Sequence, residues 1–224
     1  MSHVIAIDGP AASGKSTVAR RVAAARNSLY VDSGALYRAV TWVGLTRGIP
    51  GKDTERIIAL LDDCDFEFFV DDGAVRFSFE GRVPVDELRT AEINENVSPV
   101  AAVPEVRERV VGWLRAMSSF GTLVMEGRDI GTNVFPGAEM KFYLDASPEE
   151  RARRRHGETE GDMSVSEVGE SITRRDTIDR MRPTNPLSIA DDAEVIDTTG
   201  LSIDDVVDRV LKSIDLKNQD QAGA

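Results

Sequence analysis

The stretch Gly9-Pro10-Ala11-Ala12-Ser13-Gly14-Lys15-Ser16 decides the fold, because it fits the pattern G-x-x-x-x-G-K-[ST] in the setting where that pattern has a mechanism. The apolar run Val4–Ile7 directly precedes it, and a helical pattern begins at Lys15. Glycine allows successive backbone N–H groups to turn inward, and the start of a helix adds partial positive charge. The sequence therefore predicts a loop, between a buried strand and a helix, that holds the phosphates of a nucleoside triphosphate.

Two side chains at the end of this phosphate loop (Gly9–Ser16) have predicted chemical roles. We expect Lys15 to reach the β- and γ-phosphates and the Ser16 hydroxyl to ligate Mg²⁺. An ordinary glycine-rich turn with an exposed lysine is the alternative, and the flanking strand and helix disfavour it. The residues expected to bind ATP are Gly9, Pro10, Ala11, Ala12, Ser13, Gly14, Lys15, Ser16 and Thr17.

Short apolar runs recur along the chain, and each ends in polar or glycine-containing sequence. Runs of this length, separated by helical patterns, are typical of buried strands in a parallel α/β sheet. The five expected strands are 4–7, 29–31, 123–125, 141–144 and 194–196, and helical patterns cover 15–26, 35–47, 53–62, 104–117, 148–155, 165–181 and 202–214. Ligands of such sheets bind at the carboxyl ends of the strands, so we expect one site built from several loops.

Three segments depart from this regular alternation. Between residues 65 and 96, apolar and polar residues alternate around Asp72-Gly73, which predicts a hairpin within a small β-containing insertion at about 63–103. The polar segment 157–164 has the composition of a mobile lid, taken as about 153–168, or of an ordinary surface loop. The core of this single domain is then 1–62 and 104–216, and the polar tail at about 217–224 is expected to be disordered.

The composition is that of a globular chain, with 224 residues of which 41% are hydrophobic and 29% charged. The net charge of −12 argues against a nucleic-acid partner, so any anionic ligand must meet a local cluster of Lys and Arg. Cys64 is the only cysteine, and we expect it to be a small buried hydrophobe. With no signal-like start and no run near the roughly 20 apolar residues of a membrane span, we expect a cytoplasmic chain without a membrane partner. No large apolar stripe remains outside the expected core, which favours a monomer.

The segment Asp32-Ser33-Gly34-Ala35-Leu36-Tyr37-Arg38 follows the second expected strand and enters a helix. Ser33 and the backbone amides near it could form an anion site at the start of this helix, with Arg38 one turn further on. The alternative is that Asp32 or Ser33 only caps the helix and that Arg38 is solvated. This segment alone does not decide between the two.

The segment Glu126-Gly127-Arg128-Asp129 follows another buried strand and should lie beside the phosphate loop. Glu126 could hold the water shell of Mg²⁺, and Arg128 could neutralise a phosphoryl group in transfer. A salt bridge within the loop is the alternative.

Arg175, Asp179 and Arg182 share one face of an expected helix, because their spacing is i, i+4 and i+7. Arginine and aspartate at these spacings are commonly surface ion pairs, and spacing alone favours that interpretation.

Together these motifs resemble those of bacterial cytidylate kinases over nearly the whole chain. The segments that carry the resemblance are IDGPAASGKST (7–17), DSGALYR (32–38), VSPVAAVPEVR (97–107), EGRDIGTNVFP (126–136) and RRDTIDRMR (174–182). The resemblance implies the fold of P-loop nucleoside triphosphatases, with the hairpin region as a monophosphate-binding insertion. It also implies ATP with Mg²⁺ as phosphate donor, and CMP and dCMP as acceptors that become CDP and dCDP.

The resemblance also implies roles for individual residues. Those implied to read the cytosine base are Ser98, Arg107 and Asp129. Those implied to hold the ribose are Arg175 and Asp179, and those around the phosphates are Ser33, Arg38, Arg128 and Arg182. The implied catalytic set is Lys15, Arg38, Arg128 and Arg182. Glu126 departs from related kinases that often have aspartate here, which changes the reach to the metal by one methylene.

Two other functions would use some of the same residues. A kinase for another acceptor, such as UMP, dTMP or a small hydroxylated metabolite, would share the phosphate loop. A nucleotide switch or scaffold would bind ATP or GTP without transferring phosphate to a small molecule. The chain lacks a guanine-reading N-K-x-D sequence, and a switch leaves the segments 32–38 and 126–131 unexplained. The sequence therefore favours a pyrimidine nucleotide kinase.

Overall fold

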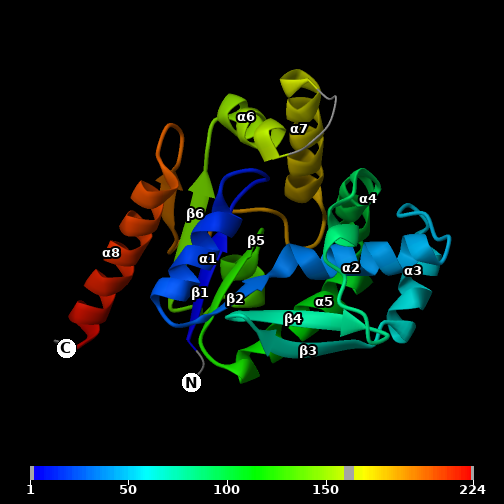
Figure 1. Ribbon diagram of the computed structural model, residues 1–224, viewed down its shortest axis with the longest axis horizontal. Helices are drawn as coiled ribbons and strands as arrows, with labels where there is room; N and C mark the ends of the chain where they lie inside the picture. Colours follow the sequence, from blue (N-terminus) through cyan, green and yellow to red (C-terminus); the bar gives the residue numbers. More distant parts are fainter. Residues whose placement is uncertain (1–2, 159–163, 223–224) are drawn as a thin grey trace.

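Strand β1 (Val4–Asp8) lies in the middle of a sheet with the strand order β3-β4-β2-β5-β1-β6-β7 (Figure 1). In the computed structural model, which describes residues 3–158 and 164–222, β1 pairs in parallel with β5 (Leu123–Gly127) and β6 (Met140–Asp145). β2 (Leu29–Asp32) and β7 (Glu194–Asp197) extend the parallel set outward. Because these strands run in the same direction, the loops that follow them meet at one edge of the sheet.

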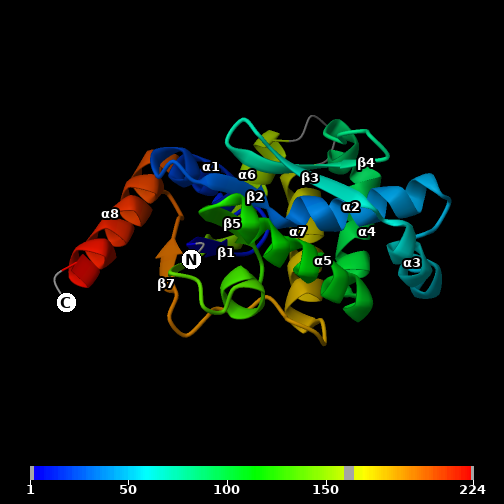
Figure 2. The ribbon, with the colours of Figure 1, turned by 90° about the horizontal axis from the view of Figure 1, so that it is seen from below.

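Helices cover both faces of these parallel strands. Ile5 and Ile7 of β1 pack with side chains of α1 (Lys15–Ala25) and α8 (Ile203–Ala222). Val4 and Ala6 point to the opposite face, which α2 (Ser33–Thr46) and α5 (Pro104–Ala116) cover. Burial on both faces explains why the strands are continuous apolar runs rather than alternating ones. α8 and α3 (Thr54–Leu60) lie at opposite ends of the molecule (Figures 1 and 2).

The sheet has seven strands rather than the five expected from sequence. β3 (Phe66–Asp71) and β4 (Ala74–Phe79) form the predicted antiparallel hairpin, and β4 joins the edge of the sheet through a parallel pair between Tyr30 and Ala74. Phe66 of the hairpin packs edge-on against Trp113 of α5, with ring centroids 5.2 Å apart. The sequence pattern predicts the hairpin, but it does not show that β2 is its partner.

The second half of the predicted β-containing insertion is helical. Helix α4 (Ala91–Ala102) begins where the Thr90 hydroxyl accepts a hydrogen bond from the Ile93 N–H at 3.3 Å, and it contains Pro99. It packs against α2 and α7, which brings it to the carboxyl edge of the sheet. Short helical turns complete the chain at Leu61–Asp63, Asp86–Arg89, Met117–Phe120 and Ile130–Val134.

Helices α6 (Pro148–Glu158) and α7 (Val165–Met181) pack together above the carboxyl ends of the strands (Figure 1). Residues 159–163 of the predicted lid lie outside the described residues. The expectation of a disordered tail from 217 is wrong for residues 217–222, since α8 continues to Ala222, and residues 223–224 are not described. None of the described helices is long and apolar enough to cross a membrane.

Candidate functional site

A cavity of about 420 Å³ lies at the carboxyl edge of the sheet, and several separate segments of the chain line it. The residues with predicted roles that line it are Ala11, Ala12, Gly14, Lys15, Ser16, Thr17, Ser33, Arg38, Ser98, Glu126, Arg128, Asp129, Arg175, Asp179 and Arg182. Gly9, Pro10, Ser13 and Arg107, which were also predicted, are not among the lining residues. The site is therefore assembled from parts of the chain far apart in sequence, as expected for a sheet of this kind.

The phosphate loop needs glycine where it leaves β1. Gly9 has φ +155°, and a Cβ atom there would lie 2.1 Å from the carbonyl oxygen of Leu144. Lys15 is buried, and its Nζ donates a hydrogen bond to the Pro10 carbonyl oxygen at 2.8 Å. Burial, together with the nearby charge of Arg128, lowers the pKa of Lys15 to about 7. An anion in the cavity would stabilise the charged form of this lysine.

Two interacting carboxylates, Asp32 and Glu126, line the cavity together with Ser16. Glu126 is buried and accepts a hydrogen bond from the Tyr30 hydroxyl at 2.9 Å. Burial and the charge of Asp32 raise the pKa of Glu126, while Lys15 and the Ser16 hydroxyl oppose the shift. Asp32 also caps α2, since it accepts from the Ala35 N–H at 3.0 Å. Hard oxygen ligands of this kind suit Mg²⁺, which keeps several waters and uses one or two carboxylates.

Three half-buried arginines line the same cavity. Arg128 donates from Nε to Asp179 at 2.9 Å, and Arg38 donates to Asn94 at 2.8 Å. The Nε of Arg175 is buried and has no hydrogen-bond partner among the described residues. Burial, followed by the charges of Arg38 and Arg128, lowers the pKa of Arg175 to about 9. These cations repel one another, and the cluster is therefore suited to an anion.

Asp129 is the centre of a buried ionic group on the α4 side of the cavity. Its carboxylate accepts from Arg107 at 2.5 Å and from Arg182 at 2.9 Å. Arg107 is 1% exposed and does not line the cavity itself, but it contacts the lining residues Asp129 and Ala101. Ser98 and Tyr37 line the cavity and are buried. Arg182, which was predicted near the phosphates, has Asp129 as its ion-pair partner and is not bonded to the phosphate loop in the described contacts.

The loop that carries Arg128 and Asp129 is fixed from two sides. At Gly127 a Cβ atom would lie 2.6 Å from the Ser33 hydroxyl, so only glycine lets β5 approach the start of α2. Asp8, at the end of β1, accepts hydrogen bonds from the backbone N–H groups of Ile130 at 2.9 Å and Gly131 at 2.8 Å. The buried Asp8 carboxylate thus holds the charged loop beside the phosphate loop.

We predict that Asp8 makes stability depend on pH in the acid range. Burial, opposed by the two N–H donors, raises the pKa of Asp8 from 3.8 to about 6. The native state then binds the proton more tightly than the unfolded state, so this contribution to stability is present below pH 4 and is lost as pH rises through 6. Relative to Asp8→Asn, the wild-type free energy of unfolding should fall by up to about 3 kcal/mol over this range. Urea unfolding of both proteins at several pH values measures the difference, and a pH-independent difference would contradict the prediction.

Sequence reasoning missed some of the residues that line the cavity. Asp32 and Tyr37 lie inside a quoted motif, but the pattern assigned them only a capping role or none. The Tyr37 hydroxyl is buried without a hydrogen-bond partner among the described residues, and burial raises the pKa of Tyr37 to about 12. Spacing was the available signal, since Tyr37 is one helical turn after Ser33. Further lining residues without a predicted role are Arg20, Arg21, Arg89 and Arg155.

Known proteins match this chain over most of its length. A family profile described as cytidylate kinase matches residues 5–216. The cytidylate kinase of Anoxybacillus flavithermus is 46% identical over 210 residues, covering 92% of this chain and 93% of that protein. The cytidylate kinase of Bacillus subtilis is 42% identical over 218 residues, covering 96% and 97%.

A solved structure of more distant sequence shares the fold. A gluconokinase from Sinorhizobium meliloti superposes with a TM-score of 0.53 at 14% identity, covering 100% of this chain and 98% of that one. At this identity the similarity concerns the arrangement of strands and helices alone.

Proposed function

The chain belongs to the cytidylate kinase family, and from that premise we propose how its cavity carries out the reaction. The chain is an ATP-dependent kinase that phosphorylates CMP. We include dCMP as a second acceptor, because more charged groups of the cavity are proposed to engage the base and the phosphate than the ribose.

The arginine cluster carries this proposal. Lys15 and the phosphate loop provide one set of groups that bind phosphate, and Arg38 and Arg128, which line the same cavity, provide a second set. A protein that binds a single nucleoside triphosphate has no need for the second set. Two anionic substrates, one donor and one acceptor, account for both sets.

The residues act by positioning and by neutralising charge. A phosphate oxygen of CMP attacks the γ-phosphorus of ATP in line, a new P–O bond forms, and the bond from the γ-phosphorus to the bridging β–γ oxygen breaks to release ADP. The attacking oxygen is already anionic, so no strong general base is required. Lys15 and Arg128 stabilise the charge on the transferring group, and Arg38 orients the acceptor phosphate.

Magnesium has a suitable place in this arrangement. Ser16 would ligate the ion directly, and Glu126 would hold it through water, with Asp32 adding negative charge nearby. The ion would supply further neutralisation of the phosphate oxygens.

The base site is proposed around Asp129 and Ser98. Cytosine offers an amino donor that a carboxylate accepts, whereas uracil offers a carbonyl oxygen at the same position. Arg107 and Arg182 hold the Asp129 carboxylate in place. Asp179, with Arg175, is proposed to hold the ribose.

The experiment that tests the function is an assay of ADP release with ATP and Mg²⁺ against a panel of CMP, dCMP, UMP, AMP, GMP and dTMP, with a control that lacks any acceptor. We expect turnover with CMP and dCMP to exceed that with UMP by at least about tenfold, because UMP leaves the carboxylate facing a carbonyl. Preferred turnover of another acceptor would refute the base site while leaving a kinase. ADP release at the same rate with every acceptor and with none would indicate ATP hydrolysis alone, and it would refute phosphoryl transfer to nucleotides.

We predict that Arg128→Ala lowers the turnover number by at least about 10²-fold, because it removes a cation that stabilises the transferring group. Arg128→Lys should recover part of the loss, since it keeps the charge but not the planar fork. Arg209→Ala is the matched control, because Arg209 is half exposed and pairs only with Glu194 in the described contacts. Steady-state kinetics with saturating substrates measure the effect, beside a thermal melt. Near-native turnover in a folded Arg128→Ala protein would remove this residue from the mechanism.

A further inference from the structure

A buried ion pair behind the phosphate loop has no role in the reaction described so far. Arg151 of α6 and Asp176 of α7 are 5% and 1% exposed, and neither is among the residues that line the cavity. The two residues come from helices that pack together above the sheet (Figure 1). They therefore do not touch a nucleotide in the cavity directly.

Both members of the pair are bonded to the same residue of the loop. The Ala11 N–H donates to Asp176 Oδ1 at 3.0 Å, and Arg151 Nη1 donates to the Ala11 carbonyl oxygen at 3.2 Å. Arg151 Nη1 also donates to Asp176 Oδ2, which closes a ring around Ala11. Arg151 Nε is fixed in turn by the Ala146 carbonyl oxygen at 3.2 Å, directly after β6. Neither backbone group of Ala11 can rotate without breaking a charge-assisted hydrogen bond.

The next residue shows why such a restraint matters. Ala12 has φ +59°, in the left-handed region that residues other than glycine rarely adopt. Such a conformation persists only where the surroundings fix it. Ala11 and Ala12 both line the cavity, so the ring around Ala11 restrains the backbone directly before its strained residue.

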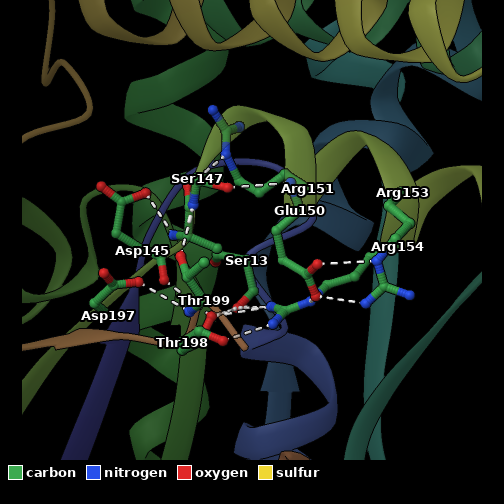
Figure 3. A network of polar contacts seen from close by, with 11 residues as sticks. Ser13, Asp145, Ser147, Glu150, Arg151, Arg153, Arg154, Asp197, Thr198 and Thr199 are labelled. Carbon is green, nitrogen blue, oxygen red and sulfur yellow. Dashed lines mark hydrogen bonds and ion pairs between the residues drawn. The ribbon is translucent and has the colours of Figure 1, made fainter. Parts of the chain in front are cut away.

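The other side of the loop is held in a comparable way (Figure 3). Thr198 donates from its hydroxyl to the Ser13 carbonyl oxygen at 3.3 Å, and Arg154 of α6 donates to the Thr198 carbonyl oxygen at 2.7 Å. The strained residue Ala12 is thus flanked by one held residue on each side. Arg153, on the same helix, is exposed and donates to Glu150, which also accepts from Arg154.

We propose that Arg151 and Asp176 are positioning residues that hold the phosphate loop in its nucleotide-binding conformation by fixing both backbone groups of Ala11. This inference rests on the proposed function only in that the loop binds the donor nucleotide. Asp176 directly follows Arg175 in α7, but the described side-chain hydrogen bonds of the pair go to Ala11, to Ala146 and between its two members, not to the acceptor residues. Its loss should therefore weaken donor binding and leave acceptor binding nearly unchanged.

The test compares the binding of MgADP and of CMP, each titrated by calorimetry, in variants of the full chain. Asp176→Asn keeps the shape of the side chain but removes its charge. We expect its Kd for MgADP to rise by at least about tenfold and its Kd for CMP to change by less than about twofold. Arg209→Met is the matched control, because Arg209 is 51% exposed and its described ion-pair partner is Glu194, so neither Kd should change.

A second variant separates positioning from stability. Replacing a buried ion pair by apolar residues of similar volume is often neutral or stabilising, so Arg151→Met/Asp176→Leu should melt near the wild-type temperature. The proposal requires this folded double variant to bind MgADP as weakly as Asp176→Asn does. Wild-type affinity for MgADP in either variant would overturn it, as would equal weakening of MgADP and CMP binding. If the acceptor panel showed preferred turnover of another acceptor, the proposed acceptor would be wrong. The proposal for Arg151 and Asp176 would not be affected, because its MgADP titration does not involve CMP turnover.

Discussion

Replacing Lys15 with alanine is expected to lower the turnover number of the kinase by about 10²-fold or more, because the change removes the phosphate-loop cation proposed to stabilise the transferring group. The fold should survive, since Lys15 has one described hydrogen bond, to the Pro10 carbonyl oxygen. Burying the Lys15 ammonium costs desolvation free energy, and this cost is the main reason that its pKa is lowered. Replacing Lys15 with alanine removes that cost. Thermal stability should therefore change much less than activity.

The measurement for Lys15 is kcat with saturating ATP, Mg²⁺ and CMP, beside a thermal melt by circular dichroism. Lys52→Ala is the matched control, because Lys52 is exposed and is not among the residues that line the cavity. Lys15→Arg tests geometry, since a guanidinium keeps the charge with a different reach. A folded Lys15→Ala protein with turnover close to the wild type would exclude this lysine from phosphoryl transfer.

Replacing Asp129 with alanine is expected to lower the free energy of unfolding by about 3–5 kcal/mol, because it leaves buried arginines without their carboxylate. Arg107 and Arg182 both donate to Asp129, and both are buried. Any protein that folds should also lose its preference for CMP over UMP. Asp129→Asn keeps the volume of the side chain and two polar atoms, an amide oxygen that accepts and an amide nitrogen that donates. It should therefore destabilise the protein less than Asp129→Ala does.

Urea unfolding measures the stability of the Asp129 variants, and the acceptor panel measures their selectivity. Asp62→Ala is the matched control, because Asp62 is 84% exposed in its ion pair with Arg109. An exposed pair of this kind is worth less than about 1 kcal/mol. If Asp129→Ala were no more destabilised than Asp62→Ala, the buried ionic group would not contribute to the fold. Unchanged selectivity for CMP would argue against the base site.

The parallel core could be predicted from the sequence because each strand is a short apolar run that ends at a polar or glycine residue. The expected run Val4–Ile7 and the strand Val4–Asp8 differ by one residue, and the other parallel strands differ from their expected runs by one or two residues. The sequence did not predict helix α4, because Pro99 interrupts its helical sequence pattern. Proline inside a helix removes a backbone hydrogen bond and is therefore unfavourable there. The polar composition of residues 217–222 predicts disorder, but these residues include lysine, glutamine and alanine, which favour helix, and they continue α8.

The candidate site could be predicted only where chemistry and position agreed. The phosphate loop has a mechanism for each residue type, and the segments 32–38 and 126–129 follow strands that end beside it. Arg151 and Asp176 gave no such signal. They lie in charged helical sequence, where most arginines and aspartates are solvated, and only the packing of α6 on α7 buries them. Burial of a charged residue depends on tertiary contacts that no local pattern records.

The placement of strand β1 divides the molecule into parts of unequal rigidity. β1 has a partner strand on each side along its length, whereas the hairpin β3–β4 is tied to β2 by the single pair Tyr30 and Ala74. Backbone amides of β1 should exchange with solvent only when the whole domain unfolds, and those of the edge hairpin should exchange through smaller openings. The phosphate loop thus follows directly after the strand that is expected to open least. The hairpin region can open locally without disturbing that loop.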